Sequence, residues 1–592
     1  MASGDQGFVE GMFNMRVLRM RLVWPRVGCA LITLAMLVAA PSAPASQAPI
    51  DFGRMAIGAH GAVVSVDGHA TSVGIEVMRA GGNAIDAAIA VGMTLAVTHP
   101  QAGNLGGGGF MVVYLAEEGR YTTLDFREKA PAAAARTMYL GEDGKPVRGL
   151  NYVGWKAVGV PGTVAGFGTA HERWGRLPWL QLVEPAVRLA VDGFFVTPYL
   201  AGSFARVAPV FRQHAASAAA FLHPDGTSFK AGELFRQPDL AWSLQQIASG
   251  GADAFYHGPI AKRVAAAMVA NGGLITAADL AAYEAIERQP VRGSYRGYEV
   301  VSMGPPSSGG TILVQMLNIL EQFDLGGMEP TSPEFVHLMA ESMRQAYFDR
   351  ALHLGDADHF AVPVDRLTSK AYARQLAAEI PRAQARTSAE LGAGVLTAAE
   401  SPETTHYSVV DADGNAVSLT YTIEAGFGAK VVAAGTGFLL NNEMGDFNEW
   451  PGVTDSRGYV GTEPNLIAPG KRPLSSMTPT IVASDGVPLA LIGSPGGKTI
   501  INTVLRVVTN LIDFGLDLPD AVDSPRVHHQ WMPDSLRLES SFPAATVAAL
   551  EAMGHSIGSS RLQGDAHCIY VYPDGARLAV ADGRRSGAAA AY

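Results

Sequence analysis

The 592-residue chain contains few cysteines, few charged residues and no apolar run of the about 20 residues that a membrane span needs. Its two cysteines, Cys29 and Cys568, exclude a disulfide scaffold and a cysteine-rich metal site. The His-Glu-x-x-His zinc signature is also absent. Charged residues make up only 17%, and a net charge of −11 without basic runs argues against nucleic-acid binding. We therefore expect neither a metal nor another cofactor.

Hydrophobic residues, by contrast, account for 48% of the chain, which is enough to build a large core. Glycine is also abundant, with 67 residues. Such a composition predicts a folded protein with many tight turns and close backbone contacts.

The N-terminus has the order of a secretory signal. Arginines at 16, 19, 21 and 26 precede an apolar run of 14 residues from Val27 to Ala40, and Ala43-Pro44-Ala45 offers a cleavage site. About 20 apolar residues are needed to span a membrane, so the run predicts a signal peptide over 1–45 and a periplasmic or secreted protein. A buried core helix is the alternative, and Met15 or Met20 is an alternative start.

Helices and strands are expected in both halves of the chain. Small residues predict a tightly packed helix over Ile85–Thr98, and Ala-rich helices follow within 160–290 and 330–380. The strands expected from alternation and β-branched residues are 63–66, Phe110–Leu115, Tyr121–Phe126, Thr405–Val410, Ala416–Thr422, Gly437–Leu440, Thr480–Val482 and Leu489–Ile492. Between the halves, Pro381–Glu403 has no period and predicts a mobile surface loop.

Two threonines are expected to meet across a hairpin. The turn at Asp413-Gly414, with Gly414 in the left-handed conformation, sets a register in which paired residue numbers sum to 826. Thr404 then lies opposite Thr422, and the two hydroxyls come within hydrogen-bond reach. Threonine pairs are common in sheets, so the pair alone does not establish a catalytic site.

Several segments resemble, in order, the motifs of the gamma-glutamyltranspeptidases. The resemblance extends from about residue 58 to 592, and its colinearity is more specific than any single motif. The segments that carry it are Gly81–Ala88, Asn104–Phe110, Asp125–Glu128, Thr404–Asp446, Pro473–Met477, Gly493–Gly497, Pro525–Gln530 and Asp582–Arg585.

This resemblance implies an N-terminal-nucleophile hydrolase with a four-layer αββα sandwich. Members are made as proenzymes that cut themselves before a threonine, which here places the cut between Glu403 and Thr404. A large subunit, 46–403, and a small subunit, 404–592, would then form one intertwined heterodimer. The implied activity transfers the gamma-glutamyl group of donors such as glutathione to water, amino acids or peptides.

The resemblance also implies the site residues. Thr404 is the nucleophile, Thr422 holds it, and Gly496 and Gly497 form the oxyanion hole. The substrate residues are Arg127, Ser475 and Ser476 for the α-carboxylate, and Glu443 and Asp446 for the α-amino group. Gly496-Gly497-Lys498-Thr499 also ends like a phosphate loop, but position 492 is Ile where that motif needs glycine.

The sequence departs from the family at Glu424, where many members have Asn, and at Gly445, where many have Asp. Three carboxylates near one ammonium would repel each other, so either Glu424 turns away or the pocket differs. Trp450–Asn465 is expected to form a lid.

Two other functions remain open: an acylase acting on β-lactam side chains or other acyl amides, and an unprocessed binding protein. His406, His528, His529 and Cys568 are interpreted as structural residues.

Overall fold

The computed structural model describes residues 50–392, 403–454 and 461–592. The chain divides into two units, Met1–Ala48 and Pro49–Tyr592. The predicted signal peptide lies outside the described residues, so the fold below is that of the second unit. Among the described residues, we find no helix that is both long and apolar enough to cross a membrane.

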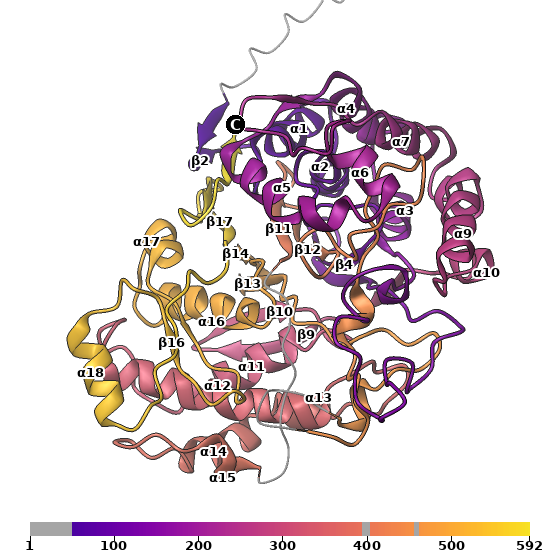
Figure 1. The fold of residues 1–592 in the computed structure, drawn as a ribbon. Coiled ribbons are helices and arrows are strands. Elements are labelled where there is room, and N and C mark those ends of the chain that lie inside the picture. The colour runs from indigo at the N-terminus through magenta and orange to yellow at the C-terminus, as the bar shows by residue number, and fades with distance from the viewer. Residues whose placement is uncertain (1–49, 393–402, 455–460) are drawn as a thin grey trace, which may run out of the picture. The chain divides into compact units, whose positions relative to one another are not determined.

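Two antiparallel sheets lie at the centre of this unit (Figure 1). The first has eight strands, in the order β1 (Asp51–Gly53), β19 (Ala588–Ala591), β3 (Ala62–Ser65), β11 (Thr405–Val410), β12 (Ala416–Thr422), β4 (Gly108–Leu115), β5 (Arg120–Phe126) and β8 (Ile286–Arg288). The second has seven, in the order β2 (Met55–Gly58), β18 (Arg577–Ala581), β17 (His567–Val571), β14 (Val487–Ile492), β13 (Thr480–Ser484), β10 (Tyr298–Ser302) and β9 (Val291–Tyr295).

The two sheets pack face to face through apolar side chains. Val112 and Tyr114 of the first sheet share a buried cluster with Ile481 and Leu491 of the second. Strands in this position are covered on both faces, which explains why β11 and β12 are buried at every residue.

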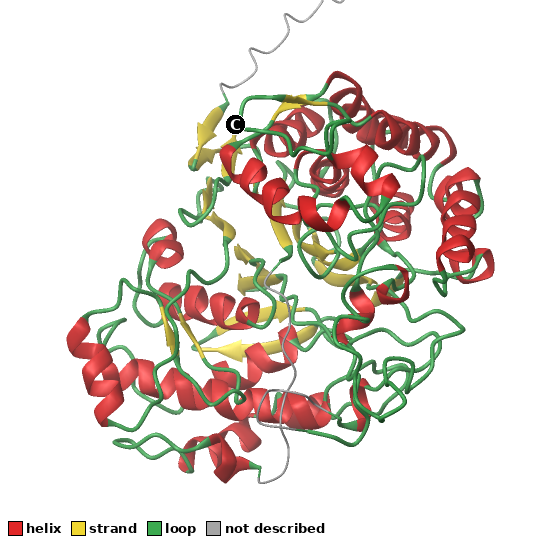
Figure 2. Ribbon diagram, in the orientation of Figure 1, coloured by secondary structure: helices red, strands yellow, loops and turns green. Residues whose placement is uncertain are grey.

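Helices cover the outer face of each sheet (Figure 2). Those packed with the first sheet are α1 (Gly68–Arg79), α2 (Ala84–Thr98), α3 (Thr163–Trp174), α4 (Trp179–Asp192), α5 (Pro198–Phe211), α6 (Ala215–Phe221), α7 (Pro238–Gly250), α8 (Asp253–Tyr256), α9 (Pro259–Asn271) and α10 (Ala277–Ala281). Those packed with the second are α11 (Gly309–Leu320), α12 (Pro333–His353), α13 (Val364–Leu367), α14 (Lys370–Ala378), α15 (Ser388–Leu391), α16 (Thr499–Ile512), α17 (Leu518–Asp523) and α18 (Ala544–Ala552). The predicted four-layer αββα arrangement is therefore confirmed.

Helix α2 shows how the sequence specifies one of these layers. Asn83 caps it by accepting from the N–H groups of Ile85 and Asp86, while the Asp86 carboxylate accepts from the Asn83 N–H. All of its small and branched side chains are buried. The helix begins one residue before the predicted range and ends where expected.

The predicted strands are mostly correct. The hairpin strands β11 and β12 have the predicted bounds, and β13 and β14 are each two residues longer than expected. The prediction for Gly437–Leu440 is wrong, because this segment forms only isolated bridges at Leu439 and Leu440. Gly437 has φ 73° and lies against the backbone of Leu240, so the chain turns there instead of extending.

The prediction of a mobile loop over Pro381–Glu403 is wrong for its first part. Thr387 caps the short helix α15, and buried Ser388 binds Asp534, Arg344 and the Trp531 carbonyl. These contacts hold the segment against the α12 layer. Residues 393–402 of the predicted loop, and 455–460 of the predicted lid, lie outside the described residues.

Candidate active site

The β11–β12 hairpin has the predicted register. Thr405 pairs with Tyr421 and Val410 with Ala416, so paired numbers sum to 826. The turn is closed by the Asp411 N–H, which donates to the Asn415 carbonyl, and Gly414 has φ 89°. This register extends by one residue to place Thr404 opposite Thr422.

The two threonine hydroxyls converge on one carbonyl group. The Thr404 hydroxyl lies 2.7 Å from the Glu403 carbonyl oxygen and 3.4 Å from the Thr422 hydroxyl. Thr422 in turn donates to the same Glu403 oxygen at 3.2 Å and accepts from the Glu424 N–H at 2.9 Å. Both side chains are buried. The arrangement places an alcohol beside the peptide bond that precedes it, with a second alcohol bound to that peptide oxygen.

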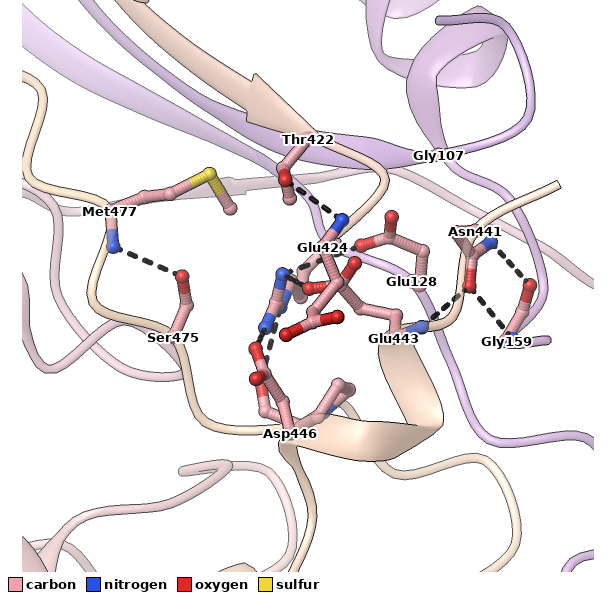
Figure 3. Close-up of polar contacts among 12 residues, drawn as sticks. Gly107, Glu128, Gly159, Thr422, Glu424, Asn441, Glu443, Asp446, Ser475 and Met477 are labelled. Atoms are coloured by element: carbon pink, nitrogen blue, oxygen red, sulfur yellow. Dashed lines mark hydrogen bonds and ion pairs between the residues drawn. The ribbon is translucent and has the colours of Figure 1, made fainter. Parts of the chain in front are cut away.

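A small polar cavity surrounds this pair, and we call it the nucleophile cavity. Its free volume is about 20 Å³, which is room for one water molecule. The residues that line it come from strand ends and loops of both sheets. They are Arg127, Glu403, Thr404, Thr422, Glu424, Glu443, Asp446, Ser475, Met477 and Gly497. Figure 3 shows Glu424, Glu443, Asp446 and Ser475 grouped below Thr422.

Arg127 is the cation of this cavity. It directly follows β5, and its own N–H donates to Asp125 at 2.9 Å, which turns the chain inward. Its buried guanidinium donates to the carboxylates of Glu443 and Asp446 and to the carbonyl oxygens of Pro473 and Leu474. The prediction that Arg127 belongs to the site is consistent with this position, and its neighbour Glu128 is buried as well.

Acids gather around this one arginine, and the pKa values of two of them, Glu443 and Glu128, are raised. Burial raises the pKa of Glu443, which the nearby charges of Glu128, Asp446 and Glu424 raise further, while Arg127 opposes the rise. Burial likewise raises the pKa of Glu128 to about 7. The cavity is therefore a strongly coupled acidic site in which one guanidinium holds the carboxylates together.

Glu424 faces the nucleophile cavity and does not turn away. Its carboxylate accepts from the Asn442 side chain, and it lines the cavity together with Glu443 and Asp446. Its backbone has φ 71°, a left-handed conformation that Asn tolerates better than Glu. The second alternative of the sequence analysis, a different amino-group pocket, is therefore the one that this geometry supports.

The two serines differ in position. Ser475 lines the nucleophile cavity, and its hydroxyl accepts from the Met477 N–H at 3.1 Å. The Ser476 hydroxyl instead accepts from Arg350 at 3.0 Å, and Ser476 is not among the residues that line the cavity. The structure thus brings Ser475, but not Ser476, to the cavity wall.

The two glycines that were predicted to form the oxyanion hole line different cavities. Gly497, with φ 56°, lines the nucleophile cavity, whereas Gly496, with φ 139°, lines a second cavity next to it. Both backbone conformations strain any residue with a Cβ atom. In Gly496 an added Cβ would also lie 2.4 Å from the Thr499 hydroxyl.

Three residues that the sequence analysis did not select hold the site together. Glu128 lies 3.6 Å from Arg127, Asn442 binds Glu424, and Arg350 binds Ser476. The only sequence signal was for Glu128, which adjoins Arg127. In a continuing strand, Glu128 would point to the face of the sheet opposite Arg127. This alternation does not apply here, because β5 ends at Phe126.

The remaining reactive side chains serve packing. His528 binds Asn502 at 2.7 Å, His529 binds Asp534 at 3.2 Å, and His406 binds Thr420 at 2.8 Å. Burial lowers the pKa of each of these histidines and raises that of the Cys568 thiol to about 12. None of these four lines the nucleophile cavity, which agrees with the structural interpretation.

One group of potential metal ligands lies elsewhere among the described residues. His337, Glu341 and His555 bring their ligand atoms within 4.8 Å of one another. The Glu341 carboxylate is bound by Arg344 and Arg386, and His337 contacts His555 and the Pro381 carbonyl. Two guanidinium groups on the carboxylate make this cluster a poor cation site.

The comparisons with known proteins agree with each other. Residues 70–592 match the model of the family described as Gamma-glutamyltranspeptidase. A glutathione hydrolase proenzyme of Escherichia coli (strain K12) is 47% identical over 552 residues, or 92% of this chain and 94% of that protein.

Solved structures show the same similarity. Cephalosporin acylase from Bacillus halodurans has a TM-score of 0.80 at 26% identity, covering 94% of this chain and 99% of that one. Gamma-glutamyltranspeptidase from Helicobacter pylori has a TM-score of 0.54 at 44% identity, covering 54% of this chain and 91% of that one. Sequence and structure therefore indicate the same group of proteins.

Proposed function

The chain belongs to the gamma-glutamyltranspeptidase family, and on this premise we propose that it is a proenzyme whose nucleophile is Thr404. The enzyme cleaves gamma-glutamyl amides such as glutathione and passes the gamma-glutamyl group to water, amino acids or peptides. The proposal rests mainly on one observation: the hydroxyls of Thr404 and Thr422 both hydrogen-bond to the Glu403 carbonyl oxygen. They do so beside a cavity that is lined by Arg127 and several acids.

Self-cleavage begins at the Thr404 hydroxyl. Its oxygen attacks the Glu403 carbonyl carbon, the bond to the Thr404 nitrogen breaks, and the hydroxyl proton ends on that nitrogen. Water then opens the resulting ester and yields a Glu403 carboxylate and a free Thr404 hydroxyl. Thr422 donates to the oxygen on which charge develops, so its hydrogen bond strengthens during the attack.

Catalysis then uses the new N-terminus. An unperturbed α-amino group has a pKa of about 7.7–8.0, so the free amine of Thr404 can take the hydroxyl proton near neutral pH. The hydroxyl attacks the gamma-glutamyl amide, the amine leaves with that proton, and an acyl-enzyme forms. Water or an acceptor amine resolves it. Gly497 lines the cavity wall, and we propose that its backbone N–H and that of Gly496 before it bind the oxyanion.

Donor recognition requires Arg127 to exchange partners. A bidentate pair between guanidinium and the donor α-carboxylate is a strong contact, but in the uncut chain Glu443 and Asp446 occupy this arginine. We infer that the donor ammonium attracts Glu443, Asp446 and Glu424, and thereby releases the guanidinium for the carboxylate. Ser475, on the cavity wall, supports the carboxylate, whereas the Ser476 hydroxyl accepts from Arg350 and does not line the cavity.

The uncut chain has no room for a donor, because its nucleophile cavity of about 20 Å³ is partly formed by Glu403. Cleavage frees Glu403 to leave, so processing also opens the site. We propose that the products are a large subunit, 46–403, and a small subunit, 404–592, which remain one heterodimer because β11 and β12 are central strands of the first sheet. The leader predicts a periplasmic or secreted enzyme.

An acylase remains the second candidate, since a cephalosporin acylase shares the fold at a TM-score of 0.80. The buried Arg127 and the acids around it favour a substrate with both an α-carboxylate and an α-amino group. We therefore favour gamma-glutamyl amides over acyl groups that lack the amine.

A denaturing gel together with a gamma-glutamyl anilide assay tests the proposal. We expect two bands from the purified protein and release of the anilide, faster when a dipeptide acceptor is added if transfer operates. A glutaryl-cephalosporin is the comparison substrate. A single full-length band, or cleavage of the cephalosporin alone, would contradict the proposed function.

A further inference from the structure

The segment from Glu424 to Lys430 connects the nucleophile cavity to a cation that the proposed mechanism does not use. Glu424 lines the cavity, and Lys430 lies at the other end of the segment. Hydrogen bonds close the chain between them into two consecutive turns. The Gly428 N–H donates to the Ala425 carbonyl at 2.6 Å, and the Lys430 N–H donates to the Phe427 carbonyl at 3.0 Å. The acid and the lysine therefore belong to one compact segment.

Both ends of this segment have a left-handed backbone. Glu424 has φ 71° and Lys430 has φ 65°. A residue with a Cβ atom is strained in this conformation, which glycine adopts freely. Such strain persists only where the surrounding structure holds it, and it gathers at functional sites. The segment thus keeps two charged side chains at positions where the backbone alone would favour glycine.

The Lys430 ammonium folds back onto its own turn. It donates to the Gly428 carbonyl at 2.5 Å, and the residue is half-buried. Burial lowers the pKa of Lys430, and the charges of Glu424 and Glu403 oppose this fall. The ammonium is therefore held where it acts on carboxylates of the nucleophile cavity, although it is not among the residues that line that cavity.

Glu403 approaches the same segment. A Cβ atom added to Gly426 would lie 3.2 Å from the Glu403 side chain. The Glu403 carboxylate also lies 3.6 Å from the Arg585 guanidinium, so a second cation faces it. In the uncut chain, Lys430 thus shares its charge between Glu403 and Glu424. Once cleavage frees Glu403 to leave, Glu424 alone keeps this lysine as its counter-charge.

The acidic side of the nucleophile cavity gains from a second cation. Glu128, Glu443 and Asp446 lie around Arg127, and the charge of Glu424 also acts on Glu443. Like charges oppose the ionisation of each carboxylate, whereas a nearby ammonium favours it. A carboxylate attracts the donor ammonium only while it is ionised. A cation behind Glu424 maintains this charge and leaves the cavity free for the donor.

We propose that Lys430 is a positioning residue for donor recognition: its ammonium keeps the Glu424 carboxylate ionised and directed toward the donor's α-amino group. The inference rests on the proposed function and deepens it, since it explains how a cavity with this many carboxylates selects a donor that carries an ammonium. Ligands with an α-amino group then depend on Lys430, whereas analogues that lack this group do not.

Three variants of the lysine test this. Lys430→Gly and Lys430→Asn remove the charge and tolerate the left-handed backbone, so neither adds strain, and Lys430→Arg keeps the charge. Each is also combined with Glu424→Asn. The matched control is Lys262→Gln, whose lysine is exposed on α9. The donor is gamma-glutamyl p-nitroanilide, and the competitive inhibitors are L-glutamate and glutarate, which differ only in the α-amino group.

In the Gly and Asn variants we expect normal two-band processing and a nearly unchanged kcat. The donor KM and the Ki of L-glutamate should rise about three- to tenfold, the usual size of coupling between residues of one charge network, while the Ki of glutarate stays the same. The acid limb of kcat/KM should move to higher pH, opposite to the shift expected for Glu424→Asn. In the Glu424→Asn background the same variants should add nothing, and Lys430→Arg and Lys262→Gln should match the wild type.

Equal weakening of L-glutamate and glutarate would overturn the inference, because Lys430 would then act on a carboxylate of the ligand. Full additivity with Glu424→Asn, or wild-type KM in both neutral variants, would overturn it as well. Failure of the wild type to cleave the anilide would instead overturn the proposed function.

Discussion

The hydroxyl of Thr422 donates to the carbonyl oxygen of Glu403 at 3.2 Å. The residue 18 positions after the proposed nucleophile thus polarises the carbonyl that the nucleophile would attack. The same hydroxyl accepts from the Glu424 N–H, which fixes its orientation and couples the hairpin to the acidic side of the nucleophile cavity.

Replacement of Thr404 should stop processing. We expect Thr404→Ala to leave a single chain of full mature length without activity, since no hydroxyl remains beside the Glu403 carbonyl. Thr404→Ser keeps the hydroxyl and should still give two fragments. The measurement is a denaturing gel with intact mass. Normal fragments from the alanine variant would sink the assignment of the nucleophile.

Thr422→Ala should slow processing without preventing folding. Charge develops on the Glu403 oxygen during attack, and losing a hydrogen bond to such an atom costs about 1.5–3 kcal/mol, or roughly ten- to hundredfold in rate. Thr422→Ser retains the donor and serves as the control. The rate is followed as the decay of precursor after refolding. An unchanged rate in the alanine variant would remove Thr422 from the cleavage step.

Arg127→Ala and Arg127→Lys should separate stability from recognition. The alanine variant leaves the buried Glu443 and the half-buried Asp446 without their cation, which costs about 3–5 kcal/mol. The lysine variant keeps the charge but loses the planar fork, so we expect near-normal processing and Tm with a donor KM at least about tenfold higher. A lysine variant with wild-type KM would argue against bidentate carboxylate recognition.

Glu424→Asn should move the pH dependence of donor binding. The charge of Glu424 raises the pKa of Glu443, so its removal lowers that pKa and keeps Glu443 ionised in more acidic solution. The acid limb of kcat/KM should shift to lower pH, while donor affinity changes by about tenfold or less. Glu118→Gln, in an exposed residue, is the control. If the limb stays in place, Glu424 does not act on the amino-group site.

Asp565→Asn should make stability less sensitive to pH. Burial raises the pKa of Asp565 to about 8 and lowers that of the neighbouring His567 to about 4. An acid whose pKa is raised on folding binds more protons in the native state, so it loses stabilisation as pH rises from about 4 to about 8. We expect Tm to fall less between pH 5 and pH 8 in the variant than in the wild type, with exposed Asp324→Asn unchanged. Identical slopes would show that Asp565 is already ionised at pH 5.

The hairpin and its two threonines could be predicted without any structure. A turn with Gly414 in the left-handed conformation sets the register of two strands only a few residues apart, and a one-residue slip would move every side chain of a strand to the opposite face of the sheet. The layer order and the location of Arg127 after a strand likewise follow local patterns or the family motifs, whereas the predicted leader stays a prediction because it lies outside the described residues.

Long-range packing decided the rest. Arg127 meets Glu443 across 316 residues of sequence, and local patterns do not show which of several carboxylates it binds. Glu424 has a left-handed backbone conformation and lines the nucleophile cavity. Gly496 and Gly497 are neighbours in the sequence but line two different cavities. The second cavity, which Gly496 lines, brings together residues that are far apart in the sequence, from 496 to 585. Periodicity specifies which face of a strand is buried, whereas the meeting of loops depends on how two sheets and their helices pack, and that information is not local.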